Sequence, residues 1–213
     1  MPRRSYDHYC GIARALDHLG ERWALLIVRE LLAGPRRYSD LLADLPGIST
    51  DVLATRLRQM ESDGLVSRSR AGARTYQLTE AGAAVAPVLD ALADWGLARL
   101  GPRTGDDAVR GHWFAAPLAR RLRPLATAID HPADGDPLTV QIQLSEVSFH
   151  LVLTGDDLRH VDGPAPRPDA ILTTDAQTAA ALAAGQLRVA DAVTGGDARL
   201  DGAESLTEAL LAL

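Results

Sequence analysis

The amino-acid sequence predicts a two-domain α+β protein, in which a helical N-terminal domain with a β-hairpin precedes an antiparallel sheet covered by helices. Three observations predict this class. Apolar residues recur at helical spacing from position 12 to position 100, a break with Gly and Pro begins at Gly101, and apolar–polar alternation begins near position 136. The length of 213 residues suits two domains, because domains cluster near ~100 to 150 residues.

Four short helices are predicted before position 63. The first three carry apolar residues over 12–19, 23–31 and 38–45, and each stops at a glycine or a proline. Ser49 offers an N-cap oxygen to the fourth helix. At about 100° per residue, the apolar residues of this fourth helix share one face, and the opposite face is polar. The apolar residues are Leu53, Leu57 and Met60.

A hairpin and a long helix follow. Residues 65–68 and 75–78 predict two strands around a basic tip at 69–74. Thr79 can cap a helix over residues 80–100, whose apolar positions form a continuous stripe. Four helices, a hairpin and a helix, in this order, are typical of a winged helix-turn-helix domain, which is predicted over residues 1–100.

The second half begins with a linker and a connector helix, predicted over residues 101–132, with the helix itself at about 112–129. From there on, one-sided alternation predicts strands, and Ala-rich segments predict helices that cover one face of an antiparallel sheet over residues 133–213. The strands are predicted at 138–144, 147–154, 158–161 and 170–173, and the helices at 176–184, 187–193 and 206–213.

Charge is distributed unevenly along the chain. The net charge is −6, yet residues 1–100 carry 13 arginines and 12 acidic residues, whereas residues 101–213 carry 9 and 16, with no lysine in either half. An acidic protein repels nucleic acid at long range. Any DNA contact would therefore need a local basic surface in the first half.

Composition argues against several other classes of protein. No apolar run approaches the roughly 20 residues needed to span a bilayer, and the opening MPRRSYDHYC lacks the apolar segment of a secretory leader, so a cytoplasmic protein without membrane contact is expected. Cys10 stands alone, which excludes an internal disulfide and a Cys-built zinc site. We expect no metal and no cofactor. Four histidines lack metal-ligand spacing and are expected at surfaces: His112, His131, His150 and His160.

The helix that begins after Ser49 meets the requirements of major-groove recognition, because a core holds its inner face and its outer face offers short hydrogen-bonding groups and Arg. Arg58 is expected to pair with guanine or a phosphate, Gln59 with adenine, and the helix start with a phosphate. The alternative is a solvated polar surface. The candidate DNA-contacting residues are Arg36, Arg37, Ser49, Thr50, Thr55, Arg56, Arg58, Gln59, Arg70 and Arg74.

An ordered series of motifs also resembles a known family. The series is CGIARALDHLGERWALLIVREL at 10–31, GPRRYSDL at 34–41, GIS at 47–49, LATRL at 53–57 and YQLTEAG at 76–82. It resembles the HxlR-type winged-helix transcription regulators over about residues 8–100. The resemblance implies a homodimer that binds a palindromic operator in double-stranded DNA, with dimer contacts from the first and last helices. The wing departs from the family, because Ala71, Gly72 and Ala73 replace the usual Pro-containing tip.

Cys10 matches the N-terminal cysteine that some members of that family use as a redox or electrophile switch. The helix start beside it favours the thiolate, whereas Asp7 opposes it. A buried, inert thiol at the dimer interface is the alternative. A catalytic pair of Cys10 with His8 or His18 lacks a third orienting group, so no enzyme is expected.

The C-terminal part resembles the sterol carrier protein type-two-like domain over about residues 130–213. The motifs are VSFHLVL at 147–153, PDAILTTD at 168–175, GQLRV at 185–189 and GDARLDG at 196–202. That family surrounds an apolar tunnel with a curved sheet and helices, which implies a hydrophobic small molecule as ligand. A solid core is the alternative for the same face. The predicted lining residues are Val140, Ile142, Phe149, Leu151, Ile171, Leu182 and Leu187.

Together these features predict a DNA-binding transcriptional regulator. It is expected to be a homodimeric repressor that an apolar small molecule or oxidation of Cys10 modulates. The alternative is a hydrophobic-ligand carrier whose N-terminal helices serve only dimerisation. Exposure of Arg58 and Arg74 beside the recognition helix would distinguish the two hypotheses.

Overall fold

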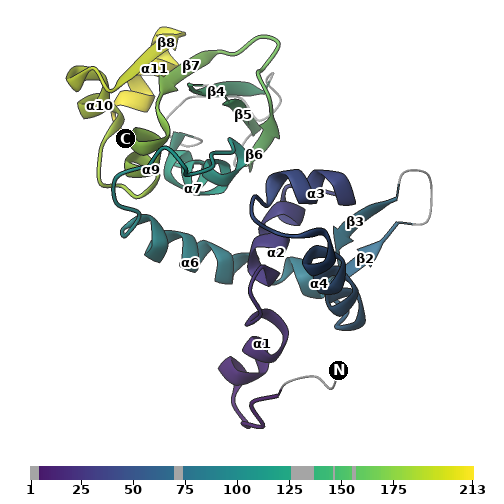
Figure 1. The fold of residues 1–213 in the computed structure, drawn as a ribbon. Coiled ribbons are helices and arrows are strands. Elements are labelled where there is room, and N and C mark those ends of the chain that lie inside the picture. The colour runs from purple at the N-terminus through teal and green to yellow at the C-terminus, as the bar shows by residue number, and fades with distance from the viewer. Residues whose placement is uncertain (1–4, 70–73, 126–136, 146, 155–156) are drawn as a thin grey trace. The chain divides into compact units, whose positions relative to one another are not determined.

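The structure is a computed structural model of residues 1–213, and it describes residues 5–69, 74–125, 137–145, 147–154 and 157–213. The chain divides into two compact units, Met1–Leu89 and Asp90–Leu213, whose elements are labelled in Figure 1. The division falls inside helix α6 (Ala86–Leu97) rather than at the boundary after Leu100 that the sequence suggests. Within the described residues, no helix is long and apolar enough to cross a membrane.

The four predicted N-terminal helices are confirmed. Residues at helical spacing bury one side of the second, third and fourth helices in a common core. Gly47, in the turn between the third and fourth, has a φ of 89°, a left-handed conformation that favours glycine. The helices are α1 (Gly11–Leu19), α2 (Ala24–Leu32), α3 (Tyr38–Asp44) and α4 (Thr50–Ser62).

A three-stranded sheet completes the winged helix-turn-helix fold of the first unit. The predicted hairpin consists of β2 (Val66–Arg68) and β3 (Thr75–Leu78). A third strand, β1 (Arg36–Arg37), was not predicted and pairs antiparallel with the other edge of β3. The tip of the wing, residues 70–73, lies outside the described residues.

The single helix predicted over residues 80–100 is wrong, because the structure has two helices there. They are α5 (Glu80–Ala83) and α6, which begins at Ala86. Pro87 explains the break, since proline has no backbone N–H and its ring would clash with the carbonyl oxygen one turn earlier in a continuous helix. In the first turn of α6, by contrast, the missing N–H has no intrahelical partner to lose.

The start of α5 is fixed against the hairpin. As predicted, the Thr79 hydroxyl acts as a cap, accepting from the Gly82 N–H at 3.1 Å, and it also donates to the Gly64 carbonyl at 2.5 Å. A Cβ at position 82 would lie 2.0 Å from the Leu65 carbonyl oxygen. The close approach of the two backbones therefore requires glycine at this position.

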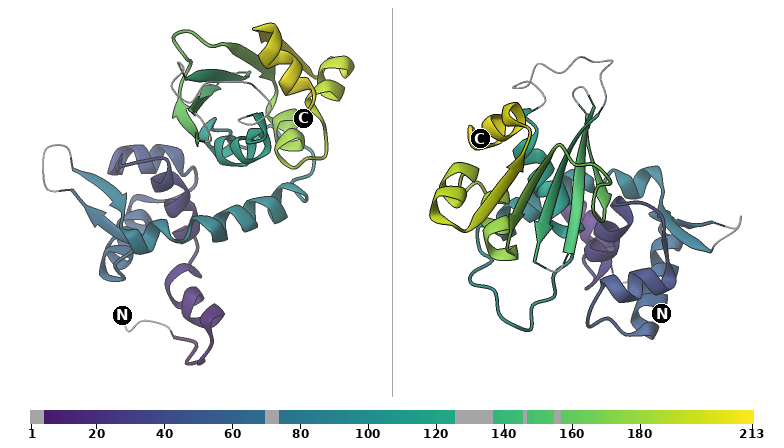
Figure 2. Two further views of the ribbon diagram at one scale, coloured as in Figure 1. Left: turned by 180° about the vertical axis from the view of Figure 1, so that it is seen from behind. Right: turned by 90° about the horizontal axis from the view of Figure 1, so that it is seen from above.

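The second unit is built on a five-stranded sheet, whose strands Figure 2 shows side by side. The strand order is β6-β5-β4-β7-β8. Four strands match the predicted ones, and the last, at the sheet edge, was not predicted. The strands are β4 (Leu138–Leu144), β5 (Val147–Thr154), β6 (Asp157–Asp162), β7 (Ala170–Thr174) and β8 (Ala198–Gly202).

The sheet is mixed, so the antiparallel sheet predicted from the sequence is wrong at its centre. β4 and β7 run parallel, whereas the other neighbouring strands are antiparallel. The Pro-containing segment 163–169 connects β6 to β7. Because β5 and β4 lie between these two strands in the sheet, the segment crosses one face of it. On that face, the Ala165 N–H donates to the Gln141 side chain at 3.0 Å, and His150 Nδ1 lies 2.9 Å from the Gly163 carbonyl oxygen.

Helices cover the opposite, apolar face of the sheet. The predicted connector helix, α7 (His112–Leu122), is part of the core of this unit rather than a connector, because Ala115, Leu118 and Leu122 are buried in the same cluster as Ile142. Residues 126–129 of that prediction lie outside the described residues. The remaining helices are α9 (Ala176–Ala183), α10 (Val189–Gly195) and α11 (Glu204–Leu211).

Candidate nucleic-acid interface

Two hydrogen bonds fix the start of α4. The Ser49 hydroxyl accepts from the Val52 N–H at 3.3 Å, which confirms Ser49 as the N-cap. The Tyr38 hydroxyl, at the start of α3, donates to the Thr50 carbonyl at 2.6 Å. These contacts hold the first turn of α4 in a set position against α3, the arrangement that a helix-turn-helix needs.

The outer face of α4 is polar and exposed. Leu53, Leu57 and Met60 are almost fully buried in the core, as predicted. On the exposed side, Arg58 Nη2 donates to the Thr55 hydroxyl at 3.2 Å. Gln59, the other residue predicted to reach a base, is exposed as well, with its amide 3.1 Å from an Asp63 carboxylate oxygen. Of the predicted residues, Thr55, Arg58 and Gln59 share this face, whereas Ser49 and Thr50 are exposed at the start of the helix.

Arg56 lies apart from this face, although it was a candidate DNA-contacting residue. Its guanidinium Nη2 is 2.9 Å from an oxygen of Glu21, and its side chain is only 20% exposed. At about 100° per residue, Arg56 falls on the side of α4 next to Met60. The ion pair joins α4 to the turn between α1 and α2, which indicates a role in packing.

The wing sheet presents several arginines. Antiparallel pairing sets Arg36 of β1 and Arg68 of β2 on either side of Tyr76, and the Arg68 guanidinium lies 5.5 Å from the Tyr76 ring centroid. Arg37 and Arg74 are exposed. Arg70 lies outside the described residues. Arg68 was missed as a candidate, because only the strand register brings it beside Tyr76.

Comparison with known proteins identifies the family of the N-terminal region. The HxlR-like helix-turn-helix family matches residues 18–103. A protein of Synechocystis sp. described as an HTH-type transcriptional regulator is 41% identical over 96 residues, which cover 41% of this chain and 71% of that protein. The regulator YvaP of Bacillus subtilis is 41% identical over 86 residues, covering 38% of this chain and 80% of YvaP. The chain belongs to the HxlR-like helix-turn-helix family.

Solved structures cover a similar share of the chain. Quinone-bound YodB of Bacillus subtilis is 34% identical, and the match covers 40% of this chain and 93% of YodB with a TM-score of 0.37. HypR, a redox regulator solved in its reduced form, is 25% identical with a TM-score of 0.40. The family match ends at residue 103. A sterol-carrier-type assignment for the sheet beyond it stays a prediction.

Cys10 of this HxlR-like chain is exposed and stands immediately before α1. The backbone N–H groups of Ala13 and Ile12 hold the pKa of the Cys10 thiol below its ordinary value, because they stabilise the thiolate. A low thiol pKa together with exposure is typical of a reactive cysteine rather than an inert one.

Large apolar side chains of the HxlR-like chain remain exposed on α1 and α6, the two helices expected to form dimer contacts. Ile12 on α1 is 74% exposed and Trp95 on α6 is 62% exposed. The Arg99 guanidinium lies over the Trp95 ring, 4.1 Å from the ring centroid. Other exposed residues of these helices are Leu16, Val88 and Leu92.

The residues predicted to line an apolar pocket lie mainly in a packed core. Val140, Ile142, Phe149 and Leu151 are almost fully buried, because α7 fills the face that the sequence left open. The cavity beside α7 measures about 10 Å³, room for about one water molecule. Leu182 and Leu187 line this cavity, whereas Ile171 is half-buried and does not line it.

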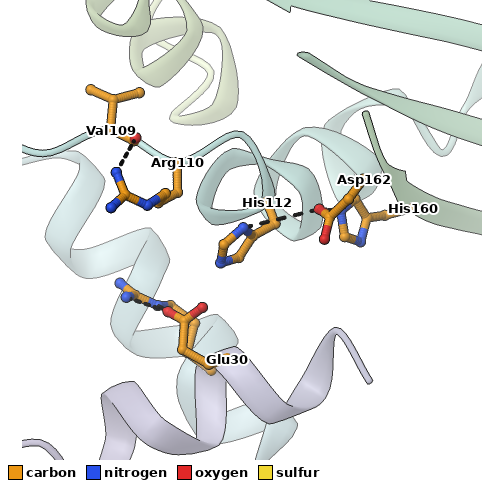
Figure 3. Close-up of polar contacts among 7 residues, drawn as sticks. Glu30, Val109, Arg110, His112, His160 and Asp162 are labelled. Atoms are coloured by element: carbon orange, nitrogen blue, oxygen red, sulfur yellow. Dashed lines mark hydrogen bonds and ion pairs between the residues drawn. The ribbon is translucent and has the colours of Figure 1, made fainter. Parts of the chain in front are cut away.

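The histidines of the second unit are less exposed than predicted. His150 is buried, and His112 and His160 are half-buried. Figure 3 shows Asp162 facing the latter two, at 4.0 Å from His112 Nδ1 and 2.9 Å from His160 Nε2. His131 lies outside the described residues. These contacts anchor the start of α7 to the end of β6, which indicates a structural role.

Proposed function

We propose that this protein is a DNA-binding transcriptional regulator that binds a palindromic operator as a homodimer and represses transcription. The observation that carries the proposal is α4, whose apolar side is buried while Thr55, Arg58 and Gln59 stand exposed on the other side. A helix supported in this way fits the major groove of DNA.

The chemistry of the exposed side chains suits base edges and phosphates. A guanidinium such as that of Arg58 can pair in bidentate fashion with guanine, and the amide of Gln59 with adenine. The start of α4 and the arginines of the wing, Arg37, Arg68 and Arg74, suit phosphate oxygens. This local basic surface is needed, because the whole chain carries a net charge of −6.

The exposed apolar residues on α1 and α6 support the proposed homodimer. Large apolar side chains that remain exposed on a protein surface are typical of an interaction site. A two-fold symmetric dimer would present two copies of α4 to half-sites about one DNA turn (~34 Å) apart, which suits a palindrome. The same apolar residues would then be covered by the partner subunit.

Modification of Cys10 is the regulatory input that we include in this proposal. Addition of the thiolate to an electron-poor C=C bond forms a C–S bond, breaks the C=C π bond and leaves the neighbouring carbon to take a proton from water. The new C–S bond lies next to α1, a helix proposed to form the dimer interface. The test is operator binding before and after N-ethylmaleimide: wild-type protein should lose affinity and Cys10→Ser should not respond. Equal responses would remove Cys10 from the proposal. The cavity beside α7, at about 10 Å³, is too small for an apolar ligand larger than a water molecule.

The test of DNA recognition begins with selection of bound duplexes from fragments of the host genome. Arg58→Ala and Gln59→Ala should each weaken binding to the selected duplex by about 1 to 3 kcal/mol and relax its sequence preference. Arg199→Ala is the matched control, because Arg199 is an exposed arginine of β8 in the second unit. Unchanged affinity and preference in both α4 variants, with folding intact, would refute the proposal.

A further inference from the structure

One apolar side chain interrupts the polar face of α4. Within α4, all of whose residues are described, Val52 is the one large apolar side chain that remains exposed, at 39% of its surface. It is absent from the core cluster that holds Leu53, Leu57 and Met60. An exposed valine in a row of hydrogen-bonding residues gains nothing from water, so its apolar surface is available to a partner.

The position of Val52 is set by its neighbours. Its N–H donates to the Ser49 cap at 3.3 Å, and the preceding turn is held through the Tyr38 hydroxyl on Thr50. The side chain therefore projects from the first turn of α4. In helix-turn-helix proteins the N-terminal residues of the recognition helix contact base edges. A valine in a helix also keeps one χ1 rotamer, so little side-chain freedom is lost on contact.

The chemistry of the major groove then identifies what Val52 can contact. Among the four bases only thymine presents an apolar group there, its C5-methyl, whereas the other base edges present donors and acceptors. Thr55 lies one turn further along α4, and Gln59 lies about two turns further on the same side as Val52. The face therefore combines one apolar and several polar contacts in a fixed order along the groove.

We propose, resting on the DNA-binding function proposed above, that Val52 specifies thymine at one position of each operator half-site by packing against its C5-methyl group. Burial of one methyl group corresponds to about 0.8 kcal/mol, which is about fourfold in affinity. Removal of the two symmetric methyl groups from a palindrome should accordingly cost roughly sixteenfold, if the two half-sites contribute independently.

The experiment uses the full-length protein and a duplex selected from genomic fragments, resynthesised with deoxyuridine in place of thymidine at one position at a time. Deoxyuridine lacks the C5-methyl but keeps the base pair. At one symmetric position, wild-type affinity should fall about fourfold per half-site. Val52→Ala should bind the thymidine and deoxyuridine duplexes equally at that position. Leu211→Ala, which removes an apolar side chain of similar exposure, 37%, from α11, is the control and should discriminate as wild type does.

Alanine has a higher helix propensity than valine, so Val52→Ala should fold, and circular dichroism checks this. Binding without any effect of deoxyuridine, or Val52→Ala that still discriminates thymidine from deoxyuridine, overturns the thymine contact and leaves the regulator function intact. If no genomic duplex is bound at all, the proposed function fails and the thymine contact fails with it.

Discussion

The outer face of α4 and the crossed face of the C-terminal sheet are both polar and both lie opposite a packed apolar core, yet they differ in what satisfies their polar groups. On the sheet, Gln141 and His150 are buried and contact the backbone of the segment that crosses it, residues 163–169. On α4, Thr55 and Arg58 contact each other at exposed positions, where a base edge can take the place of water.

The difference shows which polar residues are available for recognition. A buried polar group must be hydrogen-bonded within the fold, so its residue type is set by structure. An exposed row of hydrogen-bonding groups on a rigid helix is under no such requirement. The comparison therefore supports the proposed DNA-facing role of the first unit and indicates a structural role for Gln141 and His150 in the second.

The largest predicted effects come from removing a buried leucine from the core of either unit. Leu57→Ala in the first unit and Leu151→Ala in the second each remove a buried side chain and should cost about 2 to 5 kcal/mol in unfolding free energy. Calorimetry should show each variant lowering a different transition. Only Leu57→Ala should also weaken operator binding. A single transition lowered by both variants would mean that the units unfold together.

The next prediction concerns Trp95, which is exposed on α6. Trp95→Asp would bury a charge in the proposed dimer interface, so the variant should sediment as a monomer where the wild type sediments as a dimer. Trp95→Phe keeps an apolar ring and is the control. A well-folded dimer of Trp95→Asp would move the interface to another surface.

The smallest predicted effect is at the wing. Arg74→Ala should weaken binding about equally for all DNA sequences, because an interaction with a phosphate carries no sequence information. The slope of log affinity against log salt concentration should become shallower by about 0.9 for each phosphate that the variant no longer neutralises. Loss of sequence preference in this variant would instead mean that Arg74 reads bases.

The helices of the first unit could be predicted from sequence because their caps and apolar spacing act locally. Ser49 and Thr79 cap helices where predicted. The short strand β1 is two arginines, which carry no strand signal of their own and pair only because β3 lies beside them. The break at Pro87 was visible in the sequence, but the apolar stripe continues across it and favoured one long helix.

The second unit was harder to predict than the first. The prediction errors there concern mainly which strands pair with each other. Alternation along β4 and β7 is the same whether the pair runs parallel or antiparallel, so residues 138–144 do not reveal their neighbours. The edge strand β8 is short and ends at Gly202, which weakens its signal. The amphipathic pattern of α7 suggested a connector, although Leu118 and Leu122 belong to the core.

The candidate site was predicted in outline because helical geometry fixes which residues of α4 share a face. The exceptions depend on tertiary contacts. Arg56 forms an ion pair with Glu21, a residue 35 positions away in the sequence. Arg68 lies beside Tyr76 only because of the strand register. Val52 was not among the predicted site residues, because only hydrogen-bonding and basic side chains were selected as DNA contacts, whereas the structure shows this valine exposed.

The most direct test of the DNA-facing role of α4 is a charge reversal in each unit, measured as affinity for the same selected duplex at the same salt concentration. Arg58→Glu should weaken binding by at least about tenfold, the equivalent of about 1.4 kcal/mol. Arg199→Glu, which makes the same change of charge on β8, should have a much smaller effect. An equal loss in the two variants, or no loss for Arg58→Glu in a folded protein, would contradict the account.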